Sequence, residues 1–259
     1  MNRQAVPNAT MGLPGKPANG GSNPRFYDFD DGVTRLVKWH PSGHGAKACY
    51  NELITSRLGQ LLGAPILRGG IIYVADDIIP PDHRNEGATA GFHFGIARME
   101  GENFVPTQHY TEIENSSALP LAAVFLAWLA VGDQESHNQF LQRLEKRQEG
   151  SPAKTTKHFR LIDMGQVFGD CNWTAANVRT VHDNYRLPGH LSDKLTWAKI
   201  QPAIKTLQDL KEADIRDCFN DCPEEWNIAV PDREAGIGRV LGSRAKIEEI
   251  IRVGNPSIR

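Results

Sequence analysis

Alternating apolar and polar positions near the start of the chain predict a β-hairpin. Residues 26–29 and 34–39 both alternate in this way, and the Asp-Asp-Gly sequence at 30–32 between them is typical of a tight turn. Further β-like runs at 71–74 and 93–97 are expected to complete a small sheet. The first part of the chain is therefore predicted to be β-rich.

Apolar residues at helical spacing predict helices elsewhere. Residues 50–63 carry one apolar stripe and end in Gly63, a common C-terminal stop. Residues 119–131 are apolar on all sides, which is typical of a helix buried in a core. Two more stripes at 197–210 and 237–251 make the second half mainly helical. An α+β protein with a β-rich first lobe and a helical second lobe is expected.

Composition excludes several classes of protein. The net charge of −2 over 259 residues argues against recognition of nucleic acid by bulk charge. The longest apolar run has about thirteen residues, whereas a membrane span needs about twenty. The chain opens with no signal peptide, and its four cysteines show no disulfide or zinc pattern. We expect a soluble cytoplasmic protein with no membrane span and no direct nucleic-acid binding.

Three polar residues in the middle of the chain suggest a site for phosphoryl transfer. Asp133 lies five residues before Asn138, and Asp163 follows twenty-five residues later in an Ile-Asp-Met-Gly sequence. Protein kinases have this order of base, metal-binding amide and metal-binding carboxylate. Asn138 and Asp163 offer the hard oxygen ligands that Mg²⁺ prefers, and Asp133 is the candidate group that orients or deprotonates the attacking hydroxyl. Two short strands joined by the charged stretch 143–157 are expected to return Asp163 to Asn138.

Upstream residues supply a candidate phosphate clamp. Lys38 ends the second strand of the predicted hairpin, and Glu52 lies in the predicted first turn of the helix at 50–63. This order predicts that Lys38 contacts the phosphates of ATP and that Glu52 holds Lys38. The small residues Gly20, Gly21, Ser22 and Asn23 precede the hairpin, where their backbone N–H groups can approach a phosphate.

Each of these features has an ordinary explanation when it stands alone. A Gly-Gly-Ser stretch is commonly an exposed loop, a strand lysine is commonly a solvated edge residue, and a glutamate near a helix start interacts with the helix dipole. An aspartate after a strand often caps a turn. All of them in one order are less easily explained by chance, so the sequence predicts an ATP- and Mg²⁺-dependent kinase.

Through these motifs the chain resembles the HipA-like kinases, in particular their compact subgroup. The HipA-like kinases are related to the phosphatidylinositol 3-/4-kinase-like and protein kinase folds. The resemblance covers about residues 20–230. It includes the loop at 20–24, the Leu-Val-Lys sequence at 36–38, the Asn-Glu helix ending in Leu-Gly-Ala-Pro at 62–65, and the Phe-Gly pair at 94–95. The motifs at 133–138 and 161–165 and the Pro-Glu-Glu-Trp sequence at 223–226 complete it. The resemblance implies a two-lobed protein-kinase-like fold.

Two departures from the family pattern change what the resemblance implies. Gln134 and Glu135 follow Asp133, where the family has Arg or Lys, so the charge around the catalytic aspartate differs. The chain is also shorter than a HipA toxin and lacks the extra N-terminal domain of those toxins, which argues against a toxin role. We expect a flexible segment at 1–19, an N-lobe at 20–100 and a C-lobe at 101–259, with the lobe crossing near 96–100.

Three functions follow as hypotheses. The first is a kinase that transfers the γ-phosphoryl group of ATP to a hydroxyl, with protein Ser or Thr as the acceptor. The second is a kinase of a lipid headgroup or a small molecule. The third is a nucleotide-binding pseudokinase that acts as an interaction module. The intact set Lys38, Asp133, Asn138 and Asp163 favours an enzyme.

Overall fold

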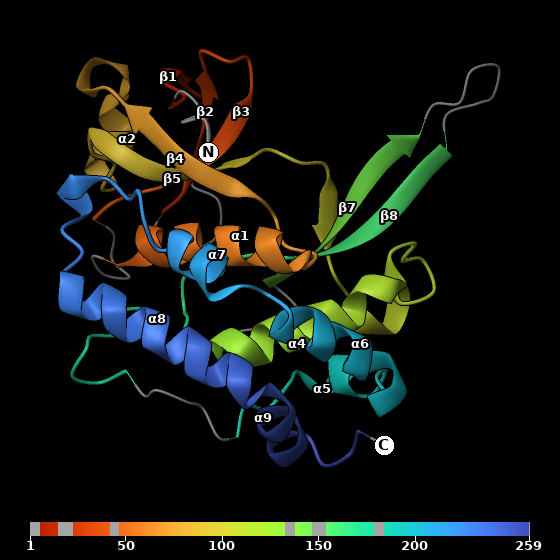
Figure 1. Ribbon diagram of the computed structural model, residues 1–259. Helices are drawn as coiled ribbons and strands as arrows, with labels where there is room; N and C mark the ends of the chain where they lie inside the picture. The colour runs from red at the N-terminus through yellow and green to blue at the C-terminus, as the bar shows by residue number, and fades with distance from the viewer. Residues whose placement is uncertain are drawn as a thin grey trace.

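The computed structural model describes residues 6–14, 23–41, 47–132, 138–146, 154–178 and 184–258. A five-stranded sheet forms the first part of the chain, and helices form most of the second part (Figure 1). Helix α1 (Ala48–Leu62) lies between this sheet and the later helices (Figure 1). The predicted division into a β-rich part and a mainly helical part is confirmed.

The five-stranded sheet is antiparallel and has the order β1-β2-β3-β5-β4. Its strands are β1 (Ala9–Gly12), β2 (Arg25–Phe29), β3 (Thr34–Lys38), β4 (Gly69–Val74) and β5 (Gly91–Ala97). Strands β2 and β3 form the predicted hairpin, and Gly32 adopts a positive φ of 76° in its turn, a conformation that glycine adopts without steric cost. The β-like runs at 71–74 and 93–97 are confirmed as β4 and β5.

The two faces of this sheet pack against different cores, because successive residues of a strand point to opposite faces. Tyr27, Val37 and Ile72 belong to an apolar cluster on the outer face, which also includes Ile79. The segment with η1 (Asp76–Ile78) and α2 (Pro81–Asn85) covers this face, and the Tyr27 hydroxyl lies 2.7 Å from Nδ1 of His83 in α2. The opposite, inner face carries Lys38 toward α1.

Strand β1 was not predicted from the sequence. Residues 1–19 were expected to form a flexible segment, but Ala9–Gly12 pairs with β2, and Ala9 is buried. Pro7 O also accepts a hydrogen bond of 3.0 Å from Tyr73 N of β4, so the N-terminal segment reaches both edges of a curled sheet. Backbone hydrogen bonds hold this strand, and its sequence Ala-Thr-Met-Gly is too short to show an apolar alternation that would reveal it.

Helix α1 is buried on nearly every side, since 11 of its 15 residues are buried. It ends at Gly63, whose positive φ of 76° is the left-handed conformation of a glycine C-cap, as the sequence predicted. The helix begins at Ala48, two residues earlier than expected. Glu52 therefore lies in the second turn and not in the first, so an interaction with the helix dipole does not explain its presence.

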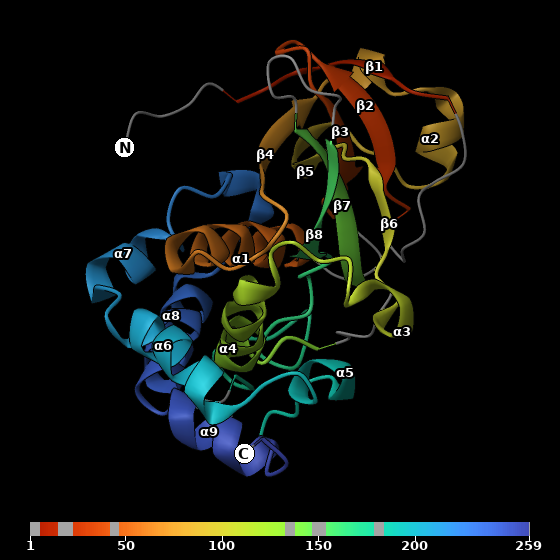
Figure 2. The same ribbon diagram turned by 90° about the vertical axis from the view of Figure 1, so that its right-hand side faces the viewer.

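Helix α4 (Leu119–Leu129) occupies the centre of the helical part (Figure 2), and nine of its 11 residues are buried, which confirms the predicted core helix. The other helices of this part are α3 (Pro106–His109), α5 (Gly189–Ser192), α6 (Trp197–Gln208), α7 (Glu212–Asp217), α8 (Val230–Ala245) and α9 (Ile247–Gly254), with short 3-10 turns at Ser116–Ala118 and Glu224–Trp226. The apolar stripe at 237–251 belongs to two helices that meet at Lys246, which explains its irregular spacing.

A second sheet joins the two parts of the chain. Its strands are β6 (Gly101–Asn103), β7 (Gln139–Lys146) and β8 (Lys154–Leu161), in the order β6-β7-β8. Strands β7 and β8 form a hairpin that extends away from the rest of the molecule (Figure 1). Gln139 pairs with Leu161 at the base of this hairpin, so the chain leaves β8 beside the residue at which it entered β7.

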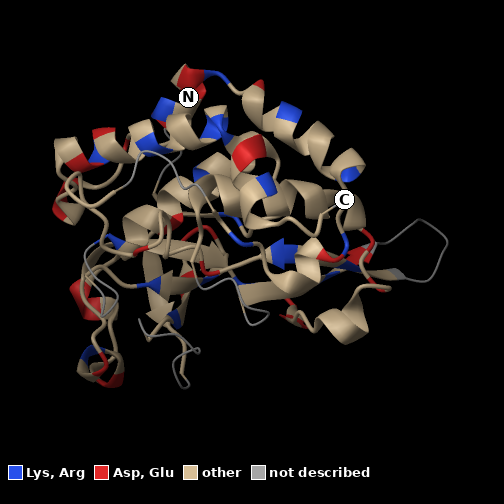
Figure 3. Cartoon of the chain, turned by 90° about the horizontal axis from the view of Figure 1, so that it is seen from below, with Lys and Arg blue, Asp and Glu red and all other residues tan. Residues whose placement is uncertain are grey.

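Charges on the helical part are mixed in sign. Seen from below, basic and acidic positions are interspersed along the described helices (Figure 3). Several form pairs four residues apart, including Lys205 with Asp209 and Arg252 with Glu248. Within the described ranges, every helix is too short or too polar to cross a bilayer.

His93 on β5 makes stability sensitive to acid. Burial lowers its pKa to about 4, from an ordinary value of 6.5, and its Nδ1 accepts a hydrogen bond of 2.9 Å from His40 N. The neutral ring is therefore the folded form, with Nε2–H donating to Thr89 O at 2.8 Å. Because the unfolded chain binds a proton first, stability should be complete above pH 6.5 and fall by about 3 kcal/mol as the pH drops to 4.

This effect is measured by urea unfolding at several pH values for the parent and for His93→Gln, which keeps one acceptor and one donor. Subtracting the two curves removes groups that titrate in both proteins. We expect the difference in the free energy of unfolding to change only between pH 6.5 and 4. Equal pH dependence in both proteins would show that His93 is not the titrating group.

Candidate active site

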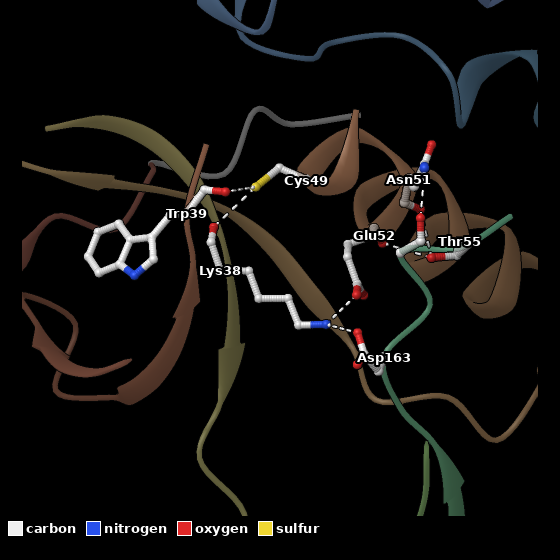
Figure 4. A network of polar contacts seen from close by, with 8 residues as sticks. Lys38, Trp39, Cys49, Asn51, Glu52, Thr55 and Asp163 are labelled. Carbon is white, nitrogen blue, oxygen red and sulfur yellow. Dashed lines mark hydrogen bonds and ion pairs between the residues drawn. The ribbon is translucent and has the colours of Figure 1, made fainter. Parts of the chain in front are cut away.

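Lys38 lies between two carboxylates from distant parts of the chain. Its Nζ donates to Asp163 Oδ1 at 2.7 Å and also forms an ion pair with Glu52 Oε1 (Figure 4). Glu52 is 14 residues away in sequence and Asp163 is 125 residues away. The structure thus brings together three residues that the sequence selected.

Three different elements deliver these side chains. Lys38 is the last residue of β3 and pairs with Phe94 of β5. Glu52 projects from the second turn of α1, and Asp163 is the second residue after the end of β8. The Cys49 thiol donates to Lys38 O at 3.1 Å and to Trp39 O at 3.2 Å (Figure 4). These contacts join the end of β3 to the first turn of α1 and so fix where Lys38 can reach.

The charges of this group depend on one another. Glu52 is buried, and burial raises its pKa above the ordinary value, while the Lys38 ammonium opposes that shift. Burial acts to lower the pKa of Lys38, but the carboxylates of Glu52 and Asp163 outweigh it, so the pKa lies above its ordinary value. Lys38 is therefore a firmly protonated cation. The side chain of Asp163 is 50% exposed, which leaves one side of the group open to solvent.

Asn138 lies close to Asp163 through the backbone. Ile162 N donates to Asn138 O at 3.0 Å, and the neighbouring pair is Gln139 with Leu161. Asp163 directly follows Ile162, the residue that donates this hydrogen bond to Asn138. The expectation that two strands return Asp163 to Asn138 is confirmed, although β7 and β8 are longer than expected, with eight residues each.

The segment after Asp163 folds back onto the end of α4. Gly132 N donates to Gln166 O at 2.9 Å, and Phe168 N donates to Leu129 O at 2.8 Å. Asp163 itself has a positive φ of 56°, an uncommon conformation for a residue with a side chain, which Asp adopts more readily than most. The loop that carries Asp163 is thus shaped by contacts on both sides of the residue.

Several predicted residues lie outside the described part of the chain. Asp133 is one of them, and Gly20, Gly21 and Ser22 are the others. Gly132, directly before Asp133, lies beside Gln166 as stated above. The roles of these four residues stay predictions.

Asn23 is described, and its side chain contacts the residue directly after α2. Its Nδ2 donates to Glu86 O at 3.1 Å, and its own carbonyl accepts from Trp39 Nε1 at 3.1 Å. Among the contacts of the described residues, Asn23 is not part of the group around Lys38. A phosphate-binding role for Asn23 stays a prediction.

Sequence reasoning missed a buried polar residue next to Glu52. Asn51 is fully buried, and its side chain forms hydrogen bonds with Gly165 O, Cys171 O and Trp173 Nε1. Its partners lie more than 100 residues away in the sequence, so no local sequence pattern predicts them. The available signal was an amide on the buried side of a helix, directly before the glutamate that contacts Lys38.

The residues present suit a divalent metal bound together with a nucleotide. Among the described residues, no group of three or more His, Cys, Asp or Glu side chains could hold a metal ion. Mg²⁺ commonly takes one or two protein oxygens, with the remaining ligands from phosphates and water. Asp163, half exposed beside Lys38, and Asn138, one ladder position away, have the right donor chemistry for that arrangement.

Comparisons with models of protein families and with the sequences of curated proteins give no match. Among solved structures, the chain is similar to the proinflammatory kinase CtkA of Helicobacter pylori, with a TM-score of 0.62, 10% sequence identity and 98% of each chain covered. Two Golgi casein kinase structures, the first with Mn and ADP bound, align with TM-scores of 0.45 and 0.46 and identities of 10% and 9%. They cover 98% and 96% of this chain and 74% and 71% of theirs.

The likeness to CtkA extends over nearly the whole of both chains and concerns the fold alone. The α+β, two-lobed protein-kinase-like fold expected from the sequence is confirmed, with a β-rich N-lobe and a mainly helical C-lobe.

Proposed function

We propose that this chain is a phosphotransferase that moves the γ-phosphoryl group of ATP to a hydroxyl group, with Ser or Thr of a protein as the acceptor. The observation that carries the proposal is the Lys38 ammonium, which contacts buried Glu52 and lies 2.7 Å from half-exposed Asp163. A cation held in this way, at an open edge of the site, is suited to bind phosphate oxygens. The kinase-like fold supports the same conclusion.

Each residue has a role that follows from its chemistry. Lys38 binds phosphate oxygens and offsets their charge, and Glu52 keeps the Lys38 ammonium in place. Asp133 orients the acceptor hydroxyl and takes its proton. Asn138 and Asp163 are the residues that would hold Mg²⁺, which when bound offsets the negative charge that develops during transfer. Backbone N–H groups of residues 20–23 complete the site over the phosphates.

The proposal includes membership of the compact HipA-like subgroup and a cytoplasmic location. The supporting observations are the sequence motifs at 36–38, 51–52, 133–138 and 161–165. An N-lobe at 20–100 and a C-lobe at 101–259 belong to the same proposal. The boundary would fall in the connection between β5 and β6, where Arg98 N donates to Thr34 O and Arg143 N donates to Glu100 O.

The alternatives differ in acceptor or in activity. A lipid headgroup or a small molecule would use the same ATP site, so only the acceptor separates these kinases from a protein kinase. A pseudokinase would bind nucleotide without transfer. The contacts of Lys38 with both Glu52 and Asp163 favour an enzyme, because degraded sites commonly lose a member of this group.

The experiment that tests the proposal is incubation of the full chain with γ-labelled ATP and Mg²⁺, with and without a host lysate. We expect label on Ser or Thr of a protein, identified by mass spectrometry. Label in the lipid or small-molecule fraction would replace the proposed acceptor, and nucleotide binding without any transferred label would support the pseudokinase. Absence of both binding and label contradicts the proposed function.

A further inference from the structure

Asn51 uses all of its side-chain hydrogen-bonding groups on one segment of the chain. Its Nδ2 donates to Gly165 O at 2.7 Å and to Cys171 O at 3.0 Å. Its Oδ1 accepts from Trp173 Nε1 at 2.9 Å. Asn51 and Trp173 are both buried, so these bonds do not compete with water. The segment 165–173 is thereby attached to α1 at three points.

The first of these points lies two residues from Asp163. Glu52, the next residue of α1, contacts Lys38, and Lys38 contacts Asp163. Two adjacent residues of one helix therefore hold the same loop. Glu52 contacts Lys38, which contacts Asp163 at the start of the loop, and Asn51 binds Gly165 directly. In addition, Glu52 Oε1 would lie 3.5 Å from a Cβ at Gly165, so α1 and the loop are in close contact here.

Other contacts fix α1 itself against the C-lobe. Lys47, directly before α1, forms an ion pair with Asp232 of α8 at 2.6 Å, and its Nζ lies 4.9 Å from the centre of the Trp173 ring. The Tyr50 hydroxyl donates to Phe219 O at 3.2 Å. Because other contacts fix the position of α1, the hydrogen bonds from Asn51 can determine the position of the loop relative to α1.

We infer that Asn51 is a positioning residue for Asp163: by attaching Gly165 to α1, it sets how strongly the site binds a divalent metal together with a nucleotide. The inference rests on the proposed function. Residues that orient a metal ligand without touching the metal commonly change metal affinity by about 10–100-fold when they are substituted. A purely structural role would instead lower stability without changing the dependence of nucleotide binding on metal.

Asn51→Leu is the informative variant. It keeps the bulk of the side chain, removes all three hydrogen bonds, and adds no charge near the metal, as aspartate would. Thr55→Val is the matched control, because Thr55 is buried on the same helix one turn later. Among the described residues, its hydroxyl donates only to the carbonyls of Asn51 and Glu52 (Figure 4).

Binding of ADP is measured by calorimetric titration, once with Mg²⁺ and once with a chelator. For Asn51→Leu we expect a loss of about 10–100-fold in ADP affinity with Mg²⁺ and no change with the chelator. Thr55→Val should match the parent in both titrations. Trp173→Phe, which removes one of the three bonds, should show a smaller loss in the same direction, and it carries the test if Asn51→Leu does not fold.

Three results would overturn the inference. The first is an ADP affinity of Asn51→Leu with Mg²⁺ that equals that of Thr55→Val. The second is a loss of ADP affinity in Asn51→Leu that is the same with Mg²⁺ and with the chelator. If only Trp173→Phe can be measured, unchanged Mg²⁺-dependent affinity counts against the inference in the same way. A parent protein that binds no ADP in the presence of Mg²⁺ is a different failure, since it contradicts the proposed function itself.

Discussion

Replacing Asp163 with alanine is expected to abolish the thermal stabilisation that ATP and Mg²⁺ give to the parent, whereas Asp133→Ala should keep it and lose phosphoryl transfer. A ligand at a hundredfold its Kd stabilises a protein by about 2.7 kcal/mol, so the parent should show a clear rise in Tm. Asp163→Ala should show none, because it removes the carboxylate proposed to hold the metal. Asp133→Ala should lower the transfer rate by about 10²–10⁴-fold, the usual contribution of a general base.

Asp170→Ala is the control for this pair. Asp170 is exposed, lies seven residues after Asp163 in the same segment, and accepts a hydrogen bond from Asn172 N at 2.9 Å. It should match the parent in both thermal unfolding and transfer of label from γ-labelled ATP. If Asp163→Ala and Asp133→Ala both behaved like Asp170→Ala, the site would have been assigned to the wrong residues.

Order along the chain selected three residues that the structure brings together in the candidate site. Lys38, Glu52 and Asp163 come from a strand, a helix and a loop. The contact of Lys38 with Glu52 was expected from their order along the chain, whereas the ion pair of Lys38 with Asp163 was not predicted. Apolar periodicity predicted the elements that carry them, since burial of one face leaves a regular pattern. The return of Asp163 to Asn138 followed from two consecutive strands, which commonly form a hairpin.

Other features have no local signature. The four residues of strand β1 are held by backbone hydrogen bonds, which do not depend on a particular side-chain pattern. Lys47, directly before α1, forms an ion pair with Asp232, which lies 185 residues later in the sequence. Asn51 likewise finds its partners at 165–173. Such contacts are decided by tertiary packing, so a sequence pattern can indicate that a buried polar residue needs a partner but not which one it has.

Replacing Lys38 with methionine should destabilise the chain as well as stop transfer. Glu52 is 4% exposed, and without Lys38 its charge would be buried with no cation beside it. Removing one partner of a buried ion pair commonly costs about 3–5 kcal/mol. We expect a loss of this size near neutral pH in urea unfolding, together with complete loss of label transfer. Lys205→Met, which removes the exposed partner of Asp209, should cost less than about 1 kcal/mol.

The pH dependence of Lys38→Met identifies the cause of the loss. Burial raises the pKa of Glu52 in the folded state and Lys38 opposes that shift, so removing Lys38 raises the pKa of Glu52 further above its unfolded value. The variant should therefore come closest to the parent in stability under acidic conditions and fall behind as the pH rises through the pKa of Glu52. A deficit independent of pH would point to lost packing of the lysine stem instead.

Lys38→Met combined with Glu52→Leu separates stability from activity. With both charges removed, the double variant buries two apolar side chains in place of an ion pair, an exchange that is often neutral or stabilising. It should regain most of the stability lost in Lys38→Met and lose the added pH dependence, while transfer of label stays absent because no cation faces the phosphates. Recovery of transfer along with stability would mean that Lys38 serves the fold and not the reaction.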